Sequence, residues 1–456
     1  MNNDNRSLRT FLVIWLGQLL SLTGSAMTRF ALLIWAYQQT GEATTLALLG
    51  FFAFMPYVLV SPIAGVWVDR IDRRTIMLLS DVGSGLATLL TLALYATGSL
   101  QIWHLYLFEG ISSALEAFQV PAYSALSTTL IPKQHFARAN GLRTLAGDAA
   151  RIAAPVFAGA LLPLIDIHGV MLIDVATFLF AVVTLALVRV VNMQGAQEKM
   201  AARGSMWDEI RTGFAFITAR RGLLGLLAIY VMINLFAGLA YFGVLPTMIL
   251  ARTGGDETAL ALVQGTLGIG GLIGGVLLSI TGGPRRKIHG VLGYCAVSFL
   301  FGDFLFAVGQ GLPVWILASL ATAVFIPFII GCNRTIWQVK TPPHLQGRVF
   351  AVQGMLQTAT VPVGYLVAGP LADRLLEPAM QPGGTLVPLF GWLVGTGAGA
   401  GMASIFLFTA VGGCTVCLLG YLWRDVRRVE LDLPDFDAEE ENPPQPILTS
   451  AQASAD

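Results

Sequence analysis

Charged residues are scarce in this chain of 456 residues, in which Lys and Arg number 27 and Asp and Glu also number 27. Together they make up 12% of the chain, about half the share that soluble domains carry. The formal net charge is zero, so the chain lacks the basic surface that nucleic-acid binding requires. This composition excludes an ordinary soluble enzyme, a disordered protein and a nucleic-acid binder.

Cysteine is also rare, and the motifs of several cofactor classes are missing. The four cysteines give no disulfide framework, and the Cys414–Cys417 CxxC pair lies inside an apolar run without a second pair. The chain has no G-x-x-x-x-G-K-[ST] motif, so nothing in it indicates ATP-driven chemistry. We therefore predict neither a metal nor a cofactor.

Hydrophobic residues, by contrast, make up 55% of the chain and gather in long runs. A membrane-spanning helix needs about 20 apolar residues, and the chain offers twelve such runs. We predict an all-α membrane protein with twelve transmembrane helices in two six-helix bundles. The spans lie roughly at 10–37, 45–68, 76–97, 102–127, 139–163, 168–190, 222–250, 257–281, 288–310, 313–337, 347–374 and 400–423.

The positive charges fall almost entirely on one side of this arrangement. All but four of the 27 Lys and Arg residues lie at the two termini or in the connections that follow even-numbered spans. The exceptions are Arg252 and Arg374 on the opposite side, and Arg29 and Arg151 within spans. Because cytoplasmic loops carry the excess of Lys and Arg, we predict cytoplasmic termini and a multi-pass protein of the cytoplasmic (inner) membrane.

A charged stretch divides the chain into four regions. We predict an N-terminal bundle (1–190), a cytoplasmic linker (191–221), a C-terminal bundle (222–428) and a disordered acidic tail (429–456). In the linker, Ile210, Phe214 and Ile217 recur at helical spacing, which predicts an amphipathic helix on the membrane surface. The alternative is a loose linker with chance periodicity.

The two bundles also show a weak internal repeat. At one offset of 210 residues, Gly65 matches Gly275, Pro132 matches Pro342, Arg138 matches Arg348 and Gly159 matches Gly369. Transporters use duplicated halves to build one binding site between two moving units.

The connection between spans two and three carries a recognisable pattern. It reads Gly65-Val-Trp-Val-Asp69-Arg70-Ile-Asp72-Arg73-Arg74. This resembles the signature loop of the major facilitator superfamily, with Asp72 at the usual loop glycine, and the D-R-x-D-R form resembles the macrolide-efflux branch of the drug:proton antiporters. The stretch KTPPHLQGRVFAVQGM, entering span eleven, is similar to the same branch. The resemblance implies the major facilitator fold, with spans one, four, seven and ten around a central cavity.

The same resemblance implies a gate at the cytoplasmic side. Asp69 would accept hydrogen bonds from the N-terminus of span eleven, near Arg348, and the loop arginines would pair with the nearby aspartates. The predicted gating residues are Gly65, Asp69, Arg70, Asp72, Arg73, Arg74, Asp81 and Arg348. The alternative is that Arg73 and Arg74 only set the topology.

Ionisable residues also interrupt the apolar runs. Each isolated charge costs about 3 kcal/mol on insertion scales, so such residues must be paired, hydrated or neutralised. Matched depths on antiparallel spans predict two ion pairs, Arg29 with Glu109 and Arg151 with Glu116 or Asp148. We predict proton coupling at Glu109, Glu116 or Asp148, since carboxylates outnumber arginines. The alternative is that these pairs only hold the bundle together, as we expect for Asp303 on span nine.

Shared helical faces suggest further residues of the central cavity. Trp15, Gln18 and Ser25 lie on the same face of span one as Arg29, and Gln119 lies on the face of span four that carries Glu116. By resemblance, spans seven and ten would add further polar and aromatic side chains, namely Tyr230, Asn234, Tyr241, Asn333 and Trp337.

These observations predict a secondary active transporter that exports small amphipathic molecules in exchange for protons. We expect a monomer in the lipid bilayer, with a small-molecule substrate and protons as its partners and no nucleic acid. One alternative is a carrier specific for a metabolite, a siderophore or a natural product, working as exporter or importer. Another is a membrane enzyme or a non-transporting receptor, but the sequence shows no convergent nucleophile and base.

Overall fold

The computed structural model describes residues 3–68, 71–131, 133–187 and 206–436. Within these ranges every regular element is helical, as the apolar runs predict. The first half contains α1 (Asn3–Thr40), α2 (Ala43–Val68), α3 (Arg73–Ala96), α4 (Ile102–Leu130), the short η1 (Lys133–His135) and α5 (Phe136–Leu187). The 52-residue α5 is broken at Asp166, where φ is 58°, and it therefore supplies spans five and six.

The second half follows the same plan, with several spans divided by π-helical segments. Its elements are α6 (Met206–Thr218), α7 (Arg221–Ala237), η3 (Gly238–Val244), α8 (Leu245–Thr253), α9 (Glu257–Thr281), α10 (Lys287–Ser298), η4 (Phe299–Asp303), α11 (Phe304–Val308), α12 (Leu312–Ala323), α13 (Ile326–Val339), α14 (Pro343–Thr358), α15 (Thr360–Pro370), η5 (Leu371–Leu376), α16 (Glu377–Met380), α17 (Val387–Val394), α18 (Ala400–Leu422), α19 (Arg424–Arg427) and α20 (Val429–Asp432).

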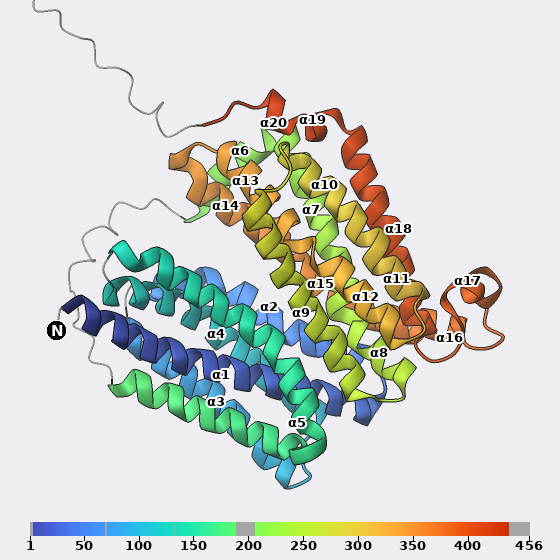
Figure 1. Cartoon of the computed structure of the whole chain (residues 1–456), viewed down its shortest axis with the longest axis horizontal. Coiled ribbons are helices and arrows are strands. Elements are labelled where there is room, and N and C mark those ends of the chain that lie inside the picture. Colours follow the sequence, from blue (N-terminus) through green and yellow to red (C-terminus); the bar gives the residue numbers. More distant parts are fainter. Residues whose placement is uncertain (1–2, 69–70, 132, 188–205, 437–456) are drawn as a thin grey trace, which may run out of the picture.

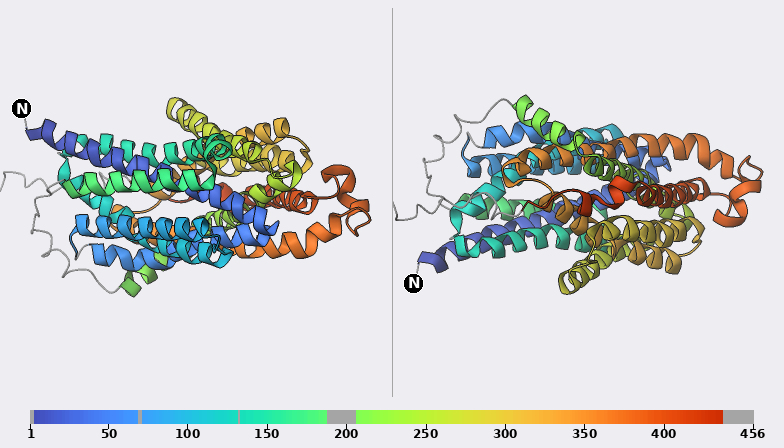
Figure 2. Two further views of the ribbon diagram at one scale, coloured as in Figure 1. Left: turned by 90° about the horizontal axis from the view of Figure 1, so that it is seen from below. Right: turned by 90° about the horizontal axis from the view of Figure 1, so that it is seen from above.

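Nine helical stretches of the described chain are long and apolar enough to cross a membrane, and the stretch Arg138–Leu187 among them is the one divided at Asp166. Within the described residues, each of the twelve predicted runs is mostly helical. The all-α, twelve-helix prediction is therefore confirmed. We call the end of the molecule where α1 begins and α18 ends the termini end, and the opposite end the far end. Figure 2 shows α17 projecting at the far end, opposite the N-terminus.

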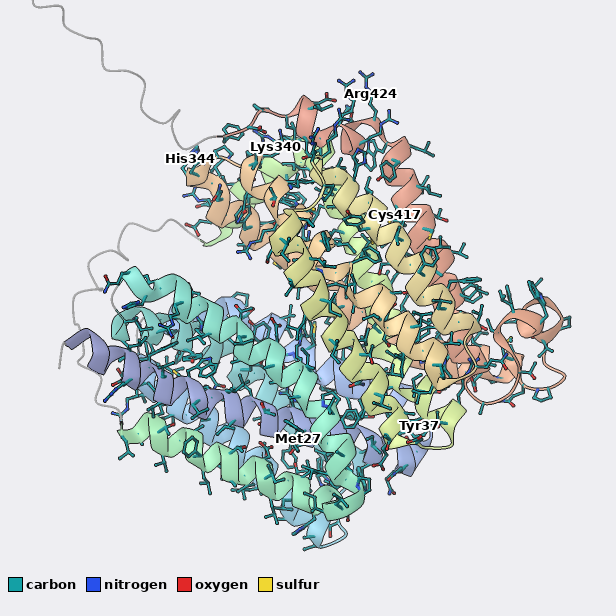
Figure 3. All side chains as sticks on the ribbon, in the orientation of Figure 1. Met27, Tyr37, Lys340, His344, Cys417 and Arg424 are labelled. Carbon is teal, nitrogen blue, oxygen red and sulfur yellow. The ribbon has the colours of Figure 1, made fainter. Side chains whose placement is uncertain are left out.

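The two halves meet at the far end and diverge toward the termini end (Figure 1). The largest hydrophobic cluster contains Phe30 and Met171 from the first half together with Met248 and Phe406 from the second. Contacts between the halves are made mainly by α5 with α9 and by α15 with α2. In Figure 3, Tyr37 lies near this junction, whereas Lys340 lies at the opposite end of the second half.

Small residues set the spacing of the helices inside the first half. A Cβ atom at Gly17 would meet Ala181 and Thr184 of α5, and one at Gly24 would meet Asp174 and Thr177. Helices in lipid associate by close packing, which small residues permit. These glycines therefore let α1 lie directly against the sixth span.

The structure differs from the prediction in the position of the linker helix and in the start of the C-terminal tail. The linker helix is present as α6, but Ile217 is fully buried in the hydrophobic cluster of the second half. The predicted lipid-facing position is therefore wrong for this side chain. The ordered chain also continues past 429, because the Glu430 carboxylate accepts hydrogen bonds from the N–H groups of Lys287 and Ile288, both at 2.9 Å. The buried Lys340 ammonium binds Asp435 at 2.5 Å. The rest of the predicted tail, 437–456, and most of the linker, 188–205, lie outside the described residues.

Ser113 accepts a backbone hydrogen bond at the point where a proline interrupts α2. Pro56 lies inside this helix, and the next residue, Tyr57, donates its backbone N–H to the Ser113 hydroxyl at 3.1 Å. Ser113 is fully buried. We expect Ser113→Ala to lower the free energy of unfolding by about 1 kcal/mol, because a buried donor loses its acceptor. Chemical unfolding in detergent measures this, with Ser112→Ala as the matched control. Equal losses in both variants would contradict the assignment.

Candidate functional site

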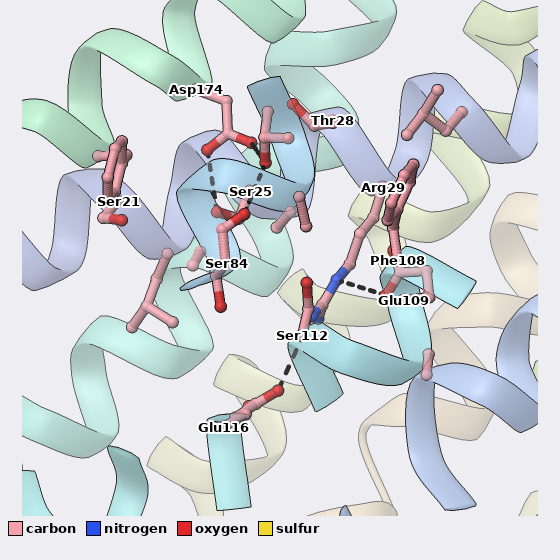
Figure 4. Close-up of a pocket in the computed structure, with 18 of the residues that line it drawn as sticks. Ser21, Ser25, Thr28, Arg29, Ser84, Phe108, Glu109, Ser112, Glu116 and Asp174 are labelled. Carbon is pink, nitrogen blue, oxygen red and sulfur yellow. Dashed lines mark hydrogen bonds and ion pairs between the residues drawn. The ribbon is translucent and has the colours of Figure 1, made fainter. Parts of the chain in front are cut away.

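A cavity of about 560 Å³ lies within the first half, among α1 to α5, with Tyr365 of α15 at its edge. Figure 4 shows that polar and charged side chains from α1, α3, α4 and α5 point into it. Nine of the predicted site residues line this cavity, namely Gln18, Ser25, Arg29, Asp81, Glu109, Glu116, Gln119, Asp148 and Arg151. The intramembrane acids of the first half therefore face a cavity and not the hydrocarbon.

Arg29 is the centre of the charged part of the cavity. Its guanidinium lies 3.3 Å from the Glu109 carboxylate and 3.8 Å from that of Glu116 (Figure 4). The predicted Arg29–Glu109 pair is thus confirmed. The predicted pairing of Arg151 with Glu116 or Asp148 is wrong for this structure. Glu116 contacts Arg29, and among the described residues no ion pair joins Arg151 to either acid. The two glutamates are seven residues apart, hence on one face of α4, so one long cation from α1 reaches both.

Asp174 is a cavity residue that the sequence interpretation missed. Its carboxylate accepts hydrogen bonds from Ser25 of α1 at 2.9 Å and from Thr88 of α3 at 3.3 Å. Only 1% of its surface is exposed. The signal was available, because Asp174 is a lone charge in the run VMLIDVATFLF of the sixth span.

Asp81 belongs to the cavity and not to the predicted gate. Its carboxylate accepts from the side-chain amides of Gln18 at 3.1 Å and Gln119 at 2.5 Å. The Gln119 amide also donates to the Gln18 oxygen at 3.1 Å. This trio, in which Gln18 and Asp81 are buried, joins α1, α3 and α4. The prediction that Asp81 pairs with the loop arginines is therefore wrong for Arg73 and Arg74, whereas Arg70 lies outside the described residues.

Two of the other predicted gating residues, Asp69 and Arg70, lie outside the described residues, and Gly65 lies near the end of α2. Asp72 caps α3 by accepting from the Thr75 N–H at 3.0 Å. Arg348 of α14 lies 3.9 Å from Glu209 of α6, within its own half. The predicted latch through Asp69 stays a prediction.

Within the part of the chain that the structure describes, Arg73 and Arg74 bind backbone carbonyls and not carboxylates. Arg73 donates to the Ala125 carbonyl of α4 at 3.1 Å, and Arg74 donates to the Leu185 and Ala186 carbonyls of α5. Cations at the C-terminal turn of a helix satisfy carbonyls that have no partner within the helix. These two arginines therefore hold the termini end of the first half together.

The remaining predicted cavity residues do not line the cavity in this structure. Trp15 donates to the Leu142 carbonyl at 2.7 Å, Asn234 donates to the Gln357 carbonyl at 3.1 Å, and Tyr241 donates to Asp303. The others pack within the hydrophobic clusters and the buried interior of the second half, namely Tyr230, Asn333 and Trp337. A shared face on a span predicts which residues lie together, but not which neighbour that face meets.

Taken together, two bundles of apolar helices close against each other at one end and enclose charged groups at membrane depth. Paired bundles with a polar site among helices define a membrane transporter and not an enzyme. The family follows from the sequence comparison: the chain belongs to the Major Facilitator Superfamily, whose model matches residues 14–365.

Several relatives resemble the chain over most of its length. Macrolide efflux protein A of Streptococcus pyogenes is 26% identical over 371 residues, which is 80% of this chain and 90% of that protein. Multidrug efflux pump Tap of Mycolicibacterium fortuitum is 24% identical over 384 residues, covering 82% and 91%. Among solved structures, the nucleoside transporter NupG aligns with a TM-score of 0.68 at 11% identity, covering 90% of this chain and 98% of that one. The structural likeness supports the fold alone.

Proposed function

We propose that this transporter exports small amphipathic molecules of the drug or macrolide kind across the cytoplasmic membrane in exchange for protons, as a monomer. The observation that carries the proposal is the charge of the cavity. Five carboxyl groups line it, from Asp81, Glu109, Glu116, Asp148 and Asp174, against the two guanidinium groups of Arg29 and Arg151. Uncompensated charges at membrane depth are costly, so protons are the natural means of balancing the excess acids.

Arg29 offers a physical link between proton binding and the shape of the site. It contacts two carboxylates at once, at 3.3 and 3.8 Å. When either glutamate takes up a proton, its attraction for the guanidinium falls, and the balance of Arg29 between the two acids shifts. A cationic or amphipathic substrate entering the cavity would compete for the same carboxylates. Proton and substrate would then exclude one another, which is the requirement for exchange.

Two further observations support the substrate class. A cavity of about 560 Å³ is within the range of about 300–1,000 Å³ that holds drug-sized ligands. Its lining mixes apolar side chains such as Phe54, Phe108 and Phe178 with the polar groups described above. The chain is also similar to proteins named for macrolide and multidrug efflux.

The proposal is tested by transport of a labelled macrolide in proteoliposomes under an imposed pH gradient. We expect Glu109→Gln and Glu116→Gln each to reduce gradient-driven transport at least about tenfold, equivalent to about 1.4 kcal/mol. The matched control is Glu42→Gln, since Glu42 is exposed in the turn before α2, outside the cavity. Full gradient-driven transport in both cavity variants would refute proton coupling at these residues, and an unmoved macrolide would refute the substrate class.

A further inference from the structure

The N-terminus of α2 is capped by a residue from the other half of the molecule. The backbone N–H groups of Ala43 and Thr44 donate to the Asp373 carboxylate at 2.9 and 2.7 Å, and the Thr44 hydroxyl donates to it at 2.6 Å. Asp373 lies in η5, about 330 positions along the chain. The first N–H groups of a helix have no partner within it, and the helix dipole favours an anion there. Both carboxylate oxygens are used, so the contact is directional as well as electrostatic.

The backbone around Asp373 lies unusually close to the N-terminus of α2. Gly369, one turn earlier, lies so close to α2 that a Cβ atom there would come within 3.0 Å of the Thr44 nitrogen and its hydroxyl. Asp373 itself lies in a π-helical segment, a geometry that is rare and recurs at functional sites. A second contact, from Gln38 of α1 to Glu257 of α9 at 3.0 Å, joins the halves at the same end.

The residues that make this contact repeat the signature loop. Gly369-Pro-Leu-Ala-Asp373-Arg374 reproduces the G-x-x-x-D-R spacing of Gly65-Val-Trp-Val-Asp69-Arg70. The first copy follows α2 at the termini end, and the second ends span eleven at the far end. The signature copy is predicted to cap the N-terminus of span eleven, and the second copy caps the N-terminus of α2. Each of these antiparallel helices thus carries an aspartate suited to the start of the other, at opposite ends of the molecule.

The equivalent interface on the other side of the molecule lacks such a cap. Gly159 of α5 lies against Ala261 of α9, as Gly369 lies against Thr44 of α2. However, the offset of 210 residues places Pro163 where Asp373 would be. The N-terminus of α9 is capped by its own neighbour, Asp256, which accepts from Thr258 and Ala259 at 2.9 and 3.1 Å. A local cap is therefore sufficient for helix stability, and the cap from the opposite half serves another purpose.

We propose that Asp373 is the latch that holds the far end closed. The carboxylate binds α2 while the cavity is sealed from the far end, and it must leave α2 when that end opens. The consequence for transport rests on the proposed function, whereas the latch itself concerns the resting arrangement of the two halves.

The test measures the distance between the halves at the far end, without substrate and without a pH gradient. Spin labels are placed at Ser99→Cys, in the exposed α3–α4 turn, and at Gln381→Cys, after α16, in the full chain in lipid nanodiscs. Signal from the native cysteines is removed by comparison with the parent protein. We expect Asp373→Ala to lower the closed-to-open ratio at least about tenfold, and Asp373→Asn to lower it by a smaller factor. Asp256→Asn is the matched control, because it weakens a local cap only, and it should leave the distribution unchanged.

Three outcomes overturn the latch: unchanged distances in a folded Asp373→Ala variant, an equal shift in Asp256→Asn, or loss of folding in Asp373→Ala with unchanged distances in the nearly isosteric Asp373→Asn. Because the distances are read without transport, failure of proton-coupled export leaves this test intact. Conversely, normal distances in the Asp373 variants would refute the latch but would not bear on the proposed proton coupling at the cavity carboxylates.

Discussion

Replacement of Arg29 with glutamine is expected to reduce gradient-driven transport about a hundredfold while the protein remains folded. The guanidinium is the only cation within 4 Å of Glu109 and Glu116 among the described residues. Without it, two carboxylates on one face of α4 repel each other with no cation in direct contact among the described residues. A hundredfold loss of transport corresponds to about 2.8 kcal/mol. The variant loses the cation whose contact with the two acids the proposed coupling depends on.

Two companion variants make the Arg29 experiment decisive. Arg29→Lys keeps the charge but loses the planar fork that reaches two acids, so we expect an intermediate rate. The double variant Arg29→Gln with Glu109→Gln removes a charge of each sign. It should recover the yield of folded protein but not the coupling to the pH gradient. Transport of the labelled macrolide and counterflow without a gradient measure the two properties separately. Normal gradient-driven transport by Arg29→Gln would remove this residue from the mechanism.

Replacement of Asp303 with alanine is expected to lower the free energy of unfolding by about 3 kcal/mol. Only 1% of Asp303 is exposed, and its carboxylate accepts from Thr409 of α18 at 2.6 Å and from Tyr241 of η3. The Tyr241 hydroxyl also lies 2.9 Å from that of Thr322 in α12. Asp303 of η4 thus joins α18 and η3 directly and reaches α12 through Tyr241. Its loss removes one acceptor from each of the Thr409 and Tyr241 hydroxyls, at about 1–3 kcal/mol each.

The control for Asp303 separates stability from coupling. Asp303→Asn keeps an acceptor oxygen, so we expect a loss of only about 1 kcal/mol. Asp432→Ala removes an exposed carboxylate that pairs with Arg428 at 3.2 Å, and such surface pairs contribute less than about 1 kcal/mol. Chemical unfolding in detergent measures all three. Transport per folded molecule should be unchanged in Asp303→Asn; a loss of gradient dependence there would give Asp303 a role in proton binding instead.

The sequence predicts well what depends on one span or on two neighbouring spans. Apolar run length fixes the helices, and matched depth on antiparallel spans was enough to pair Arg29 with Glu109. Sequence patterns gave wrong partners where the contacts of a side chain depend on which helices lie next to it in three dimensions. The sequence predicts Asp81 as a gating residue because it lies close to the loop arginines in the chain, whereas its partners Gln18 and Gln119 come from two other helices.

Contacts between the halves were beyond the reach of sequence patterns. The Asp373 contact with α2 depends on how two bundles are placed relative to each other, which no periodicity encodes. The same reason explains Tyr241 and Trp337. Their spacing on spans seven and ten is helical, as predicted, but the faces that carry them are turned into the interior of the second half.

The contact of Glu430 with α10 has a consequence for biosynthesis. The N-terminus of α10, at Lys287 and Ile288, is capped by a carboxylate that lies about 143 positions later in the chain. In the first half, Asp72 caps α3 from the adjacent position, so that helix is complete as soon as it is synthesised. At the termini end, the cap of α3 can therefore form early in translation, whereas the cap of α10 forms only when nearly the whole polypeptide has been translated. At the far end, α2 of the first half also waits for a distant residue, because Asp373 follows it by about 330 positions.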